Sequence, residues 1–399
     1  MLNISRLLQN IDDMTDSLRY SKESSQSLTG TGRDKGPVVV WNVTRACNLN
    51  CQHCYAGDSS TPHPRELNTR QARKLITELA QMNVPVLLFS GGEPLLRDDI
   101  KELIAYAREQ GIMVSLSSNG TLIDPVTARE LKELGVSYVG ISIDGAPVTH
   151  NRFRGKDNAY QQTLAGIKNC QQAGQKVGLR FTMVEENRRE IDAIFQLVQE
   201  QDIPRICFYH LVPQGKGKSL KKSMISAGAK RQLIDSIITR AKKLQAESPD
   251  KEILTVANQS DGVFLYLRLK REGDSRAEKV YNYLRRNGGN RSGQAIACID
   301  WRGEVYPDQF SFAHSAGNVR KKSFAEIWQQ DPSRLLEKLR QRHKYITGRC
   351  SECEWFEICN GNMRTRAESL TGNYWASDPG CYLTDRETKN FSFSDSPRA

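Results

Sequence analysis

The sequence predicts an α/β protein, built as a partial (β/α)6, TIM-like barrel with a small second domain at its C-terminus. Six short apolar runs alternate with segments of helical periodicity between residues 37 and 212. Ten cysteines are present, and most of them form two groups, one after the first apolar run and one near the C-terminus. A chain of 399 residues fits one barrel with a smaller appendage.

The predicted strands are the apolar runs, and capping residues and helical spacing mark the helices between them. The strands cover 38–43, 84–89, 112–116, 138–143, 177–183 and 205–211, and the later helices cover about 100–108, 126–134, a stretch through 164 and 167, and 191–198. Asn68 and Gln71 form a capping-box pattern at the start of the first helix. Because parallel strands joined by helices end at one rim, we expect the functional side chains there.

Composition divides the chain into five segments. Residues 1–36 carry a short amphipathic helix, with a stripe of Ile4, Leu7, Leu8 and Ile11, followed by a linker. Residues 37–212 form the barrel, 213–297 a basic helical insertion, 298–383 a small domain rich in Cys, Trp and Gly, and 384–399 a disordered tail. The alternation of strand and helix is expected to stop after Leu211.

The net charge of +11 is compatible with nucleic acid, a membrane surface or an acidic substrate as partner. No nucleic-acid-binding motif accompanies it, and its densest stretch, Lys216, Lys218, Lys221 and Lys222, is interpreted as a solvated loop. No apolar run approaches the roughly 20 residues that cross a bilayer. The N-terminus lacks the pattern of a signal peptide. We therefore expect a cytoplasmic protein that binds neither nucleic acid nor membrane.

The first cysteine group, Cys47-x3-Cys51-x2-Cys54, offers three thiolates from one short loop after the first predicted strand. Three ligands on a [4Fe–4S] cube leave one iron open to another molecule. Zinc is the alternative, but a closed structural zinc site needs a fourth ligand, and His53 is too tightly placed between two cysteines to converge easily. Gly91-Gly92-Glu93-Pro94 follows the second predicted strand, where glycines permit close backbone approach and Glu93 offers an anion to an ammonium group.

These motifs together resemble those of the radical S-adenosylmethionine (SAM) superfamily. The resemblance implies that Cys47, Cys51 and Cys54 hold a catalytic [4Fe–4S] cluster and that the Gly91–Pro94 motif holds the methionine amino group of SAM. By position on the rim, Asn119 and Ser142 resemble residues that contact the SAM ribose or carboxylate, and Arg180 the arginine that pairs with the carboxylate. The implied chemistry is cleavage of SAM to a 5′-deoxyadenosyl radical that abstracts a hydrogen atom from the substrate.

The second group, Cys350-x2-Cys353-x5-Cys359 with Cys381 further on, has four soft ligands. A zinc site built from four cysteines is the alternative, but the spacing resembles the SPASM/twitch extension of radical SAM enzymes. Full SPASM domains hold two auxiliary clusters. This chain has Asp308 and Met363 where two ligands of one of them are expected, so we expect one auxiliary cluster and two [4Fe–4S] clusters in all. The isolated Cys170, Cys207 and Cys298 are interpreted as buried apolar side chains.

Several longer runs resemble the NirJ/AhbC group of tetrapyrrole-modifying radical SAM enzymes. Among them are PVVVWNVTRACNLNCQHCYA, CFYHLVPQGKG and CEWFEICNGNMRTRAESLTGNYWASDPG, and the likeness extends from about residue 35 to 385. It implies a substrate such as 12,18-didecarboxysirohaem, from which either two acetates are removed towards haem or two propionates towards haem d1. It also implies an electron donor such as ferredoxin or flavodoxin.

Basic side chains and histidines are the candidates for anchoring such a polycarboxylate ring. They are Arg152, Arg154, Lys216, Arg364 and Arg366, with His210 and His314 as options for an axial iron ligand. For each of these seven residues an ordinary surface or core role is the alternative, and it is the favoured one. The alternative functions are a peptide-modifying SPASM maturase, a cluster carrier and an RNA-modifying radical SAM enzyme.

Overall fold

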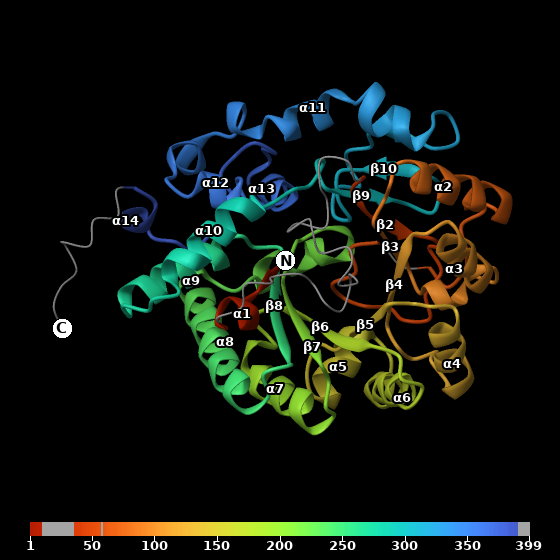
Figure 1. The fold of residues 1–399 in the computed structure, drawn as a ribbon, viewed down its shortest axis with the longest axis horizontal. Coiled ribbons are helices and arrows are strands. Elements are labelled where there is room, and N and C mark those ends of the chain that lie inside the picture. Colours follow the sequence, from red (N-terminus) through yellow and green to blue (C-terminus); the bar gives the residue numbers. More distant parts are fainter. Residues whose placement is uncertain (10–35, 57–58, 390–399) are drawn as a thin grey trace.

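A computed structural model describes residues 1–9, 36–56 and 59–389. The predicted α/β class is confirmed, because the six predicted strands all form and lie side by side in one parallel array (Figure 1). They are β2 (Val38–Asn42), β3 (Val86–Ser90), β4 (Met113–Ser118), β5 (Tyr138–Ser142), β6 (Val177–Met183) and β7 (Arg205–His210). The whole sheet has 11 strands in the order β1-β8-β7-β6-β5-β4-β3-β2-β9-β10-β11.

Helices connect these strands as the periodicity predicts. They are α2 (Thr69–Gln81), α3 (Ile100–Glu109), α4 (Pro125–Glu133), α6 (Ala159–Gln172) and α7 (Ile191–Glu200). At the start of α2, the Asn68 side chain accepts from the Gln71 amide and the Gln71 side chain accepts from the Asn68 amide, which confirms the predicted capping box. A further helix, α5 (Pro147–Arg154), precedes α6 and was not predicted from the sequence.

The segment 213–297 is not purely helical, which corrects the sequence-based expectation. After the 3-10 segment η4 (Gly215–Ser223) and helix α8 (Ala227–Glu247), the β-branched run at β8 (Glu252–Val256) pairs in parallel with β7. The alternation of strand and helix therefore continues for one more unit beyond Leu211. Helices α9 (Ser260–Arg271) and α10 (Ala277–Asn287) follow it.

Strands at both edges tie the two ends of the chain to the barrel. The edge strand β1 (Leu2–Asn3) pairs antiparallel with β8, and the short helix α1 (Ile4–Leu7) follows it, so part of the predicted N-terminal helix forms. At the other edge β9 (Ile296–Ile299) pairs in parallel with β2, and β10 (Glu304–Tyr306) and β11 (Gly317–Asn318) continue the sheet antiparallel. Ile11 and nearly all of the predicted linker lie outside the described residues.

The C-terminal part continues through α11 (Arg334–Arg340), α12 (Phe356–Cys359), α13 (Arg364–Thr371) and α14 (Asp385–Thr388), and α12 lies against α9 and α10 (Figure 1). Helix α14 corrects the prediction of a disordered tail from residue 384. Thr384 and Glu387 form a capping box there, and the Glu387 carboxylate also accepts two hydrogen bonds from Arg231 on α8, at 2.7 and 2.6 Å. Residues 390–399 of that predicted tail lie outside the described residues.

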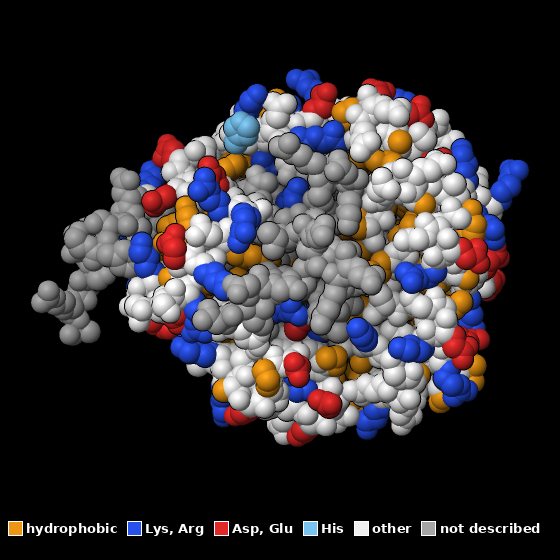
Figure 2. Space-filling view, viewed as in Figure 1, with side chains coloured by type: hydrophobic (Ala, Val, Ile, Leu, Met, Phe, Trp, Pro, Cys, Tyr) orange, Lys and Arg blue, Asp and Glu red, His pale blue; other side chains and the backbone are white. Residues whose placement is uncertain are grey.

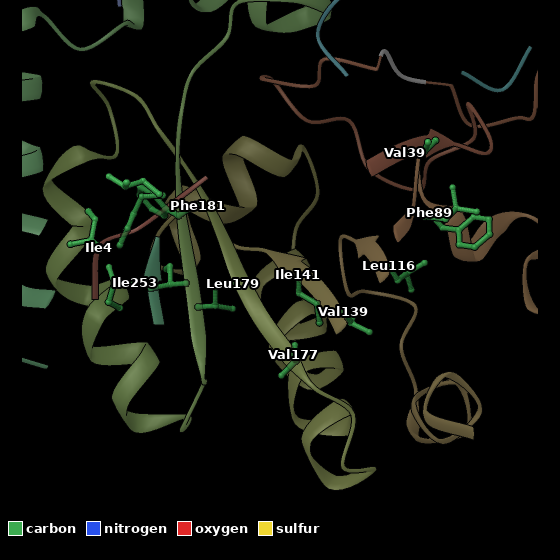
Figure 3. Close-up of a cluster of buried hydrophobic side chains, with 14 of the residues drawn as sticks. Ile4, Val39, Phe89, Leu116, Val139, Ile141, Val177, Leu179, Phe181 and Ile253 are labelled. Atoms are coloured by element: carbon green, nitrogen blue, oxygen red, sulfur yellow. The ribbon is translucent and has the colours of Figure 1, made fainter. Parts of the chain in front are cut away.

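One hydrophobic core runs through the sheet and the helices that cover it. Figure 3 shows strand side chains that meet there, among them Val139, Leu179 and Phe181, each fully buried. Burial of one such side chain contributes about 1.5–3 kcal/mol. Cys170, Cys207 and Cys298 are also buried, as predicted.

Charges of both signs are mixed on the visible part of one face of the molecule. On the face shown in Figure 2, Lys and Arg side chains are scattered among Asp and Glu. No helix in the described part of the chain combines the length and the apolar character that crossing a membrane requires.

Candidate active site with two cysteine groups

The first cysteine group lies on the loop that follows β2, at the carboxyl rim of the barrel. Cys47, Cys51 and Cys54 pack together with Leu49 and Ala159 in one small cluster. Burial raises the pKa of the Cys47 thiol to about 12, and the neighbouring Cys51 and Cys54 contribute in the same direction. The structure therefore brings the three predicted ligands together, in surroundings that disfavour free thiolates and leave them to be stabilised by bound iron.

The glycines of the next rim loop are required by the close approach of two backbones. Gly92 donates its amide proton to the Thr44 carbonyl at 2.9 Å, and Glu93 donates to the Ala46 carbonyl at 2.7 Å. A Cβ atom on Gly92 would lie 2.0 Å from the Ala46 carbonyl oxygen, and Gly91 has a φ of +141°. This loop thus fixes the segment that leads into Cys47.

Glu93 is fully buried and joins two rim loops. Its carboxylate accepts from the Ser118 hydroxyl at 2.9 Å, the Asn119 amide at 2.8 Å and the Leu95 amide at 3.3 Å. Burial raises the pKa of Glu93 to about 7, although these hydrogen bonds act in the opposite direction. Direct contact with an ammonium group, the role expected from the sequence, would require this loop to open, because the side chain has no exposed surface.

Of the three further residues predicted to contact SAM, Asn119 directly follows β4, Ser142 ends β5 and Arg180 lies in the middle of β6. The Asn119 amide group donates to Asn48 at 2.8 Å, on the cysteine loop. Ser142 and Arg180 are register partners on adjacent strands. Arg180 donates one N–H to the Ser117 hydroxyl, and its buried Nε and second Nη have no partner among the described residues. A half-satisfied guanidinium at the rim fits a carboxylate ligand such as that of SAM.

The second cysteine group is also brought together in the C-terminal part, where Cys350 and Cys353 lie on and just after one 3-10 turn, Cys359 ends α12 and Cys381 lies on a later loop. Burial raises the pKa of Cys359 well above its usual value, and Cys381, Cys350 and Cys353 add to the effect, so all four thiols are neighbours. The Cys350 amide donates to the Ser377 hydroxyl at 2.9 Å, which fixes its place beside the Cys381 loop. Nowhere in the described residues do three His, Cys, Asp or Glu side chains converge as ligands of a single metal ion.

The two residues that replace cysteines of a second auxiliary cluster are occupied by contacts within the chain. The Met363 sulfur accepts from the Asn290 amide group at 3.0 Å. The Asp308 carboxylate accepts from the Phe310 amide at 2.8 Å and the Ser311 hydroxyl at 2.9 Å, as in a capped turn, although the turn is buried rather than solvated. Cys298 packs elsewhere, with Val40 and Tyr306.

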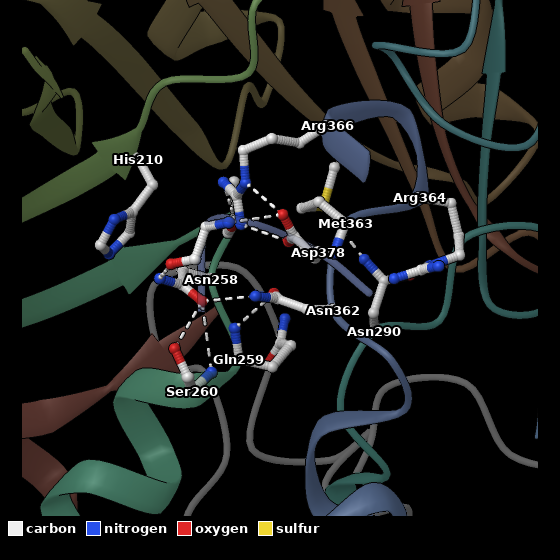
Figure 4. A network of polar contacts seen from close by, with 12 residues as sticks. His210, Asn258, Gln259, Ser260, Asn290, Asn362, Met363, Arg364, Arg366 and Asp378 are labelled. Carbon is white, nitrogen blue, oxygen red and sulfur yellow. Dashed lines mark hydrogen bonds and ion pairs between the residues drawn. The ribbon is translucent and has the colours of Figure 1, made fainter. Parts of the chain in front are cut away.

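Three candidate substrate residues have internal partners instead, which agrees with the core role favoured for them over substrate binding. Arg366 binds the Asp378 carboxylate at 2.9 and 2.7 Å and the Ala257 carbonyl at 2.9 Å (Figure 4). Arg364 donates to the Tyr374 and Ala376 carbonyls, and the His210 ring lies 2.8 Å from Asp261. The described hydrogen bonds of Arg364 stay within the C-terminal part, His210 at the end of β7 pairs with Asp261 on α9, and Arg366 joins the C-terminal part to the residue after β8. All three side chains are buried.

The other four candidates lie at different depths. Arg152 is exposed and pairs with Glu186 at 3.2 Å, and the partly exposed His314 contacts Glu368 at 2.8 Å. Lys216 lies beside the cysteine loop, where its amide donates to the Cys54 carbonyl at 2.9 Å. Arg154 is buried between Asp144 and Cys51.

An aromatic contact that the sequence did not reveal connects the cysteine loop to the C-terminal part. The Tyr55 ring, next to Cys54, lies edge-on to Phe310 with centroids 5.2 Å apart and stacks on Phe312 at 6.2 Å. The only sequence signal was an aromatic residue beside a predicted ligand.

Comparison with known proteins identifies the family. Residues 41–198 match the model of the radical SAM superfamily, and residues 291–354 match SPASM, an iron-sulfur cluster-binding domain. The chain is 47% identical to the Fe-coproporphyrin III synthase of Methanosarcina barkeri, over 97% of this chain and 98% of that protein. This chain is a radical SAM enzyme. It is also 39% identical to the pre-heme d1 synthase of Dinoroseobacter shibae, over 88% of this chain and 87% of that protein.

Solved structures show the same fold. This radical SAM enzyme matches Streptococcus suis SuiB bound to the precursor peptide SuiA with a TM-score of 0.67, over 88% of this chain and 76% of that one. The sequence identity is 16%, so the likeness concerns the fold alone. The radical SAM and SPASM matches imply iron–sulfur clusters and SAM as cofactors.

Proposed function

We propose that this radical SAM enzyme removes the two acetate side chains of 12,18-didecarboxysirohaem and so forms iron-coproporphyrin III. The observation that carries the proposal is the 47% identity to Fe-coproporphyrin III synthase over almost the full length of both chains. The 39% identity to pre-heme d1 synthase places propionate removal second. Sequence runs across the barrel and the C-terminal domain support the same group.

The proposed cofactors are two [4Fe–4S] clusters and SAM. Cys47, Cys51 and Cys54 hold the first cluster, and Cys350, Cys353, Cys359 and Cys381 hold the second, since each set of thiols is already brought together. The first cluster and SAM, when bound, would supply the one-electron radical chemistry by which hydrogen is abstracted from the substrate, and the three cysteines would hold that cluster.

The residues of the chain position these groups. Arg180 offers two unpartnered nitrogens, Nε and one Nη, to the SAM carboxylate, close to Ser142 on the neighbouring strand. Glu93 holds the Asn119 loop, whose side-chain amide binds Asn48 on the cysteine loop, so this part of the rim is fixed before SAM binds.

The proposed electron donor is a small acidic protein such as ferredoxin or flavodoxin. The chain has a net charge of +11, and exposed lysines of η4 lie next to the loop of the first cluster. Complementary charge of this kind speeds encounter between redox partners.

Anaerobic turnover with 12,18-didecarboxysirohaem, SAM and a reductant tests the proposal. We expect 5′-deoxyadenosine to form and the substrate mass to fall in two equal steps, each matching an acetate side chain. Cys51→Ala should abolish both signals, while Cys170→Ala, which changes an isolated buried cysteine, should retain them. Loss of propionate units would move the reaction to the haem d1 route. Stimulation by peptides with no response to tetrapyrroles would overturn the substrate assignment.

A further inference from the structure

Arg154, one of the basic residues expected to meet the substrate, lies instead against a ligand of the first cluster. Its guanidinium donates a hydrogen bond from one Nη to the Cys51 sulfur at 3.5 Å. The other Nη forms an ion pair with the Asp144 carboxylate at 2.6 Å. Arg154 is only 6% exposed, so a carboxylate of a large ring cannot reach it without displacing the cysteine loop.

The backbone around Arg154 fixes this contact. The last turn of α5 is clamped to the cysteine loop, because the Asn50 amide donates to the Arg154 carbonyl at 3.1 Å and the Gln52 amide to the Phe153 carbonyl at 2.9 Å. Gly155 ends the helix with a φ of +62°, and a Cβ there would lie 2.7 Å from the Asn50 carbonyl oxygen. The distance from Arg154 to Cys51 is therefore set by the fold and not by a flexible side chain alone.

Two histidines, His150 and His53, lie near Arg154, but Arg154 is the basic side chain that contacts the Cys51 sulfur. Burial lowers the pKa of His150 to about 3, with Arg154 adding to the effect, and the His150 ring accepts a hydrogen bond from the Asp144 amide at 3.2 Å. The His53 Nε2 lies 3.5 Å from the Asp144 carboxylate, and the N–H that reaches the Cys51 sulfur comes from Arg154.

Asp144 orients the guanidinium and partly offsets its charge. Burial alone would raise the pKa of Asp144, but Arg154 holds it below its usual value, so the carboxylate is ionised at neutral pH. The result is a buried dipole whose positive end is directed at the Cys51 sulfur.

We propose that Arg154 raises the reduction potential of the cluster held by Cys47, Cys51 and Cys54, with Asp144 as the residue that positions it. Reduction adds one negative charge to a cluster whose ligands are already thiolates. A cation and an N–H directed at one of these sulfurs stabilise the reduced form more than the oxidised form. A cluster with a higher reduction potential can be reduced by a weaker electron donor, and this reduction precedes SAM cleavage.

The proposal rests on the cluster assigned under the proposed function, but not on the substrate. An EPR-monitored redox titration without substrate measures it, using the signal that changes when SAM is added and therefore belongs to the first cluster. For Arg154→Met we expect about a tenfold smaller equilibrium constant for reduction, a shift of ~59 mV to more negative potential for one electron. Arg154→Lys keeps the charge but not the planar fork, so a smaller shift is expected.

Arg205→Met is the matched control, because it breaks another buried arginine–carboxylate pair, with Glu252, at the opposite end of the parallel strands. It should destabilise the fold in the same way and leave the potential unchanged. An unchanged potential in Arg154→Met with full iron content would overturn the proposal.

If the Arg154→Met variant does not retain the first cluster, the reduction potential of the Asp144→Asn variant is measured instead. This variant keeps the arginine and removes its counter-ion, so a more positive potential supports the proposal and an unchanged or more negative one contradicts it. Wild-type protein without iron at the first cysteine group would overturn both this proposal and the cluster assignment. Failure of tetrapyrrole turnover alone would leave the potential measurement valid.

Discussion

Gly92 lies so close to the cysteine loop that a methyl group would collide with the Ala46 carbonyl. Its neighbour Glu93 uses its carboxylate to hold the Ser118–Asn119 turn. At the scale of single residues, this motif therefore builds the rim of the barrel. Arg180, unlike Glu93, is not fully satisfied by contacts within the chain, since two of its nitrogens are buried without a partner in the described structure. An unsatisfied guanidinium is costly unless a ligand completes it.

Arg180 has unpartnered nitrogens, whereas the Glu93 carboxylate is hydrogen-bonded within the chain, so the two residues should affect SAM binding and stability differently. Arg180→Met should lower SAM affinity by roughly ten- to a hundredfold, since a charge-assisted hydrogen bond is worth about 1.5–3 kcal/mol. Its folding stability should stay near that of the wild type. Glu93→Ala should also weaken SAM binding, but it should cost about 1–3 kcal/mol of stability because it leaves buried donors unsatisfied. Equilibrium dialysis with labelled SAM and denaturant unfolding measure the two quantities.

Arg152→Met is the control for this pair, because the Arg152 side chain is exposed and pairs with the exposed Glu186. It should change neither affinity nor stability by a measurable amount. An unchanged SAM affinity in Arg180→Met would remove Arg180 from the binding site.

At the scale of elements, η4 has a position that its sequence alone did not indicate. The lysine-rich stretch predicted to be a solvated loop follows β7 and lies against the cysteine loop, with Gly215 so close to the Cys54 and Tyr55 carbonyls that a Cβ would clash with both. Lys218, Lys221 and Lys222 remain exposed there. The lysine-rich segment is thus hydrogen-bonded to a predicted ligand of the first cluster, because the Lys216 amide donates to the Cys54 carbonyl.

This position predicts where an acidic electron donor binds. Lys218→Glu combined with Lys222→Glu should slow reduction of the enzyme by flavodoxin about tenfold at low ionic strength, because attractive steering becomes repulsive. Reduction by dithionite, a small inorganic reductant, should change much less. Stopped-flow absorbance of the clusters gives both rates, and the difference should shrink as salt screens the charges.

Lys132→Glu combined with Lys176→Glu provides the matched control. Both lysines are exposed and precede β5 and β6, at the end of the barrel away from the cysteine loop. Equal slowing in the two double variants would show that net charge acts rather than a docking site on η4. An unchanged rate in the η4 variant would place the donor elsewhere.

At the scale of the whole molecule, the fold joins two distant cysteine groups to one sheet. Strand β9 extends the barrel next to β2, the strand that leads into the first group. Tyr55 meets Phe310 and Phe312 across the boundary with the C-terminal part. The buried Arg366–Asp378 pair connects the Cys381 loop to the ends of the barrel strands. Loss of one partner of such a pair typically costs about 3–5 kcal/mol.

Two separate cysteine sets predict about eight irons per chain after anaerobic reconstitution, from two [4Fe–4S] clusters. Replacing Cys47, Cys51 and Cys54 with Ala should remove half of the iron and all SAM cleavage. Replacing Cys350, Cys353 and Cys359 should remove the other half and leave the SAM-sensitive EPR signal. Iron and sulfide analysis measures both, and stoichiometric zinc at the C-terminal group would contradict the auxiliary cluster.

The sequence by itself determined the order of strands and helices and the identity of the cysteine groups. Short apolar runs, the Asn68 capping box and the spacing of Cys47, Cys51 and Cys54 are local patterns, so they can be read without knowing what packs against them. Strand β8 was missed because a short, partly polar β-branched run inside a helical region is ambiguous until it pairs with β7.

Only the tertiary structure decided which charged residues face a ligand. Arg154, Arg364, Arg366 and His210 carried the same charge signal in the sequence as true surface anchors, yet all four are buried. Arg154 lies against Cys51, Arg366 against the Ala257 carbonyl and His210 against Asp261, all of them distant in the chain. Whether a cation meets solvent, a carboxylate or a cysteine sulfur depends on which residues the fold places within about 3 Å of it. That is a property of long-range contacts, which no local pattern contains.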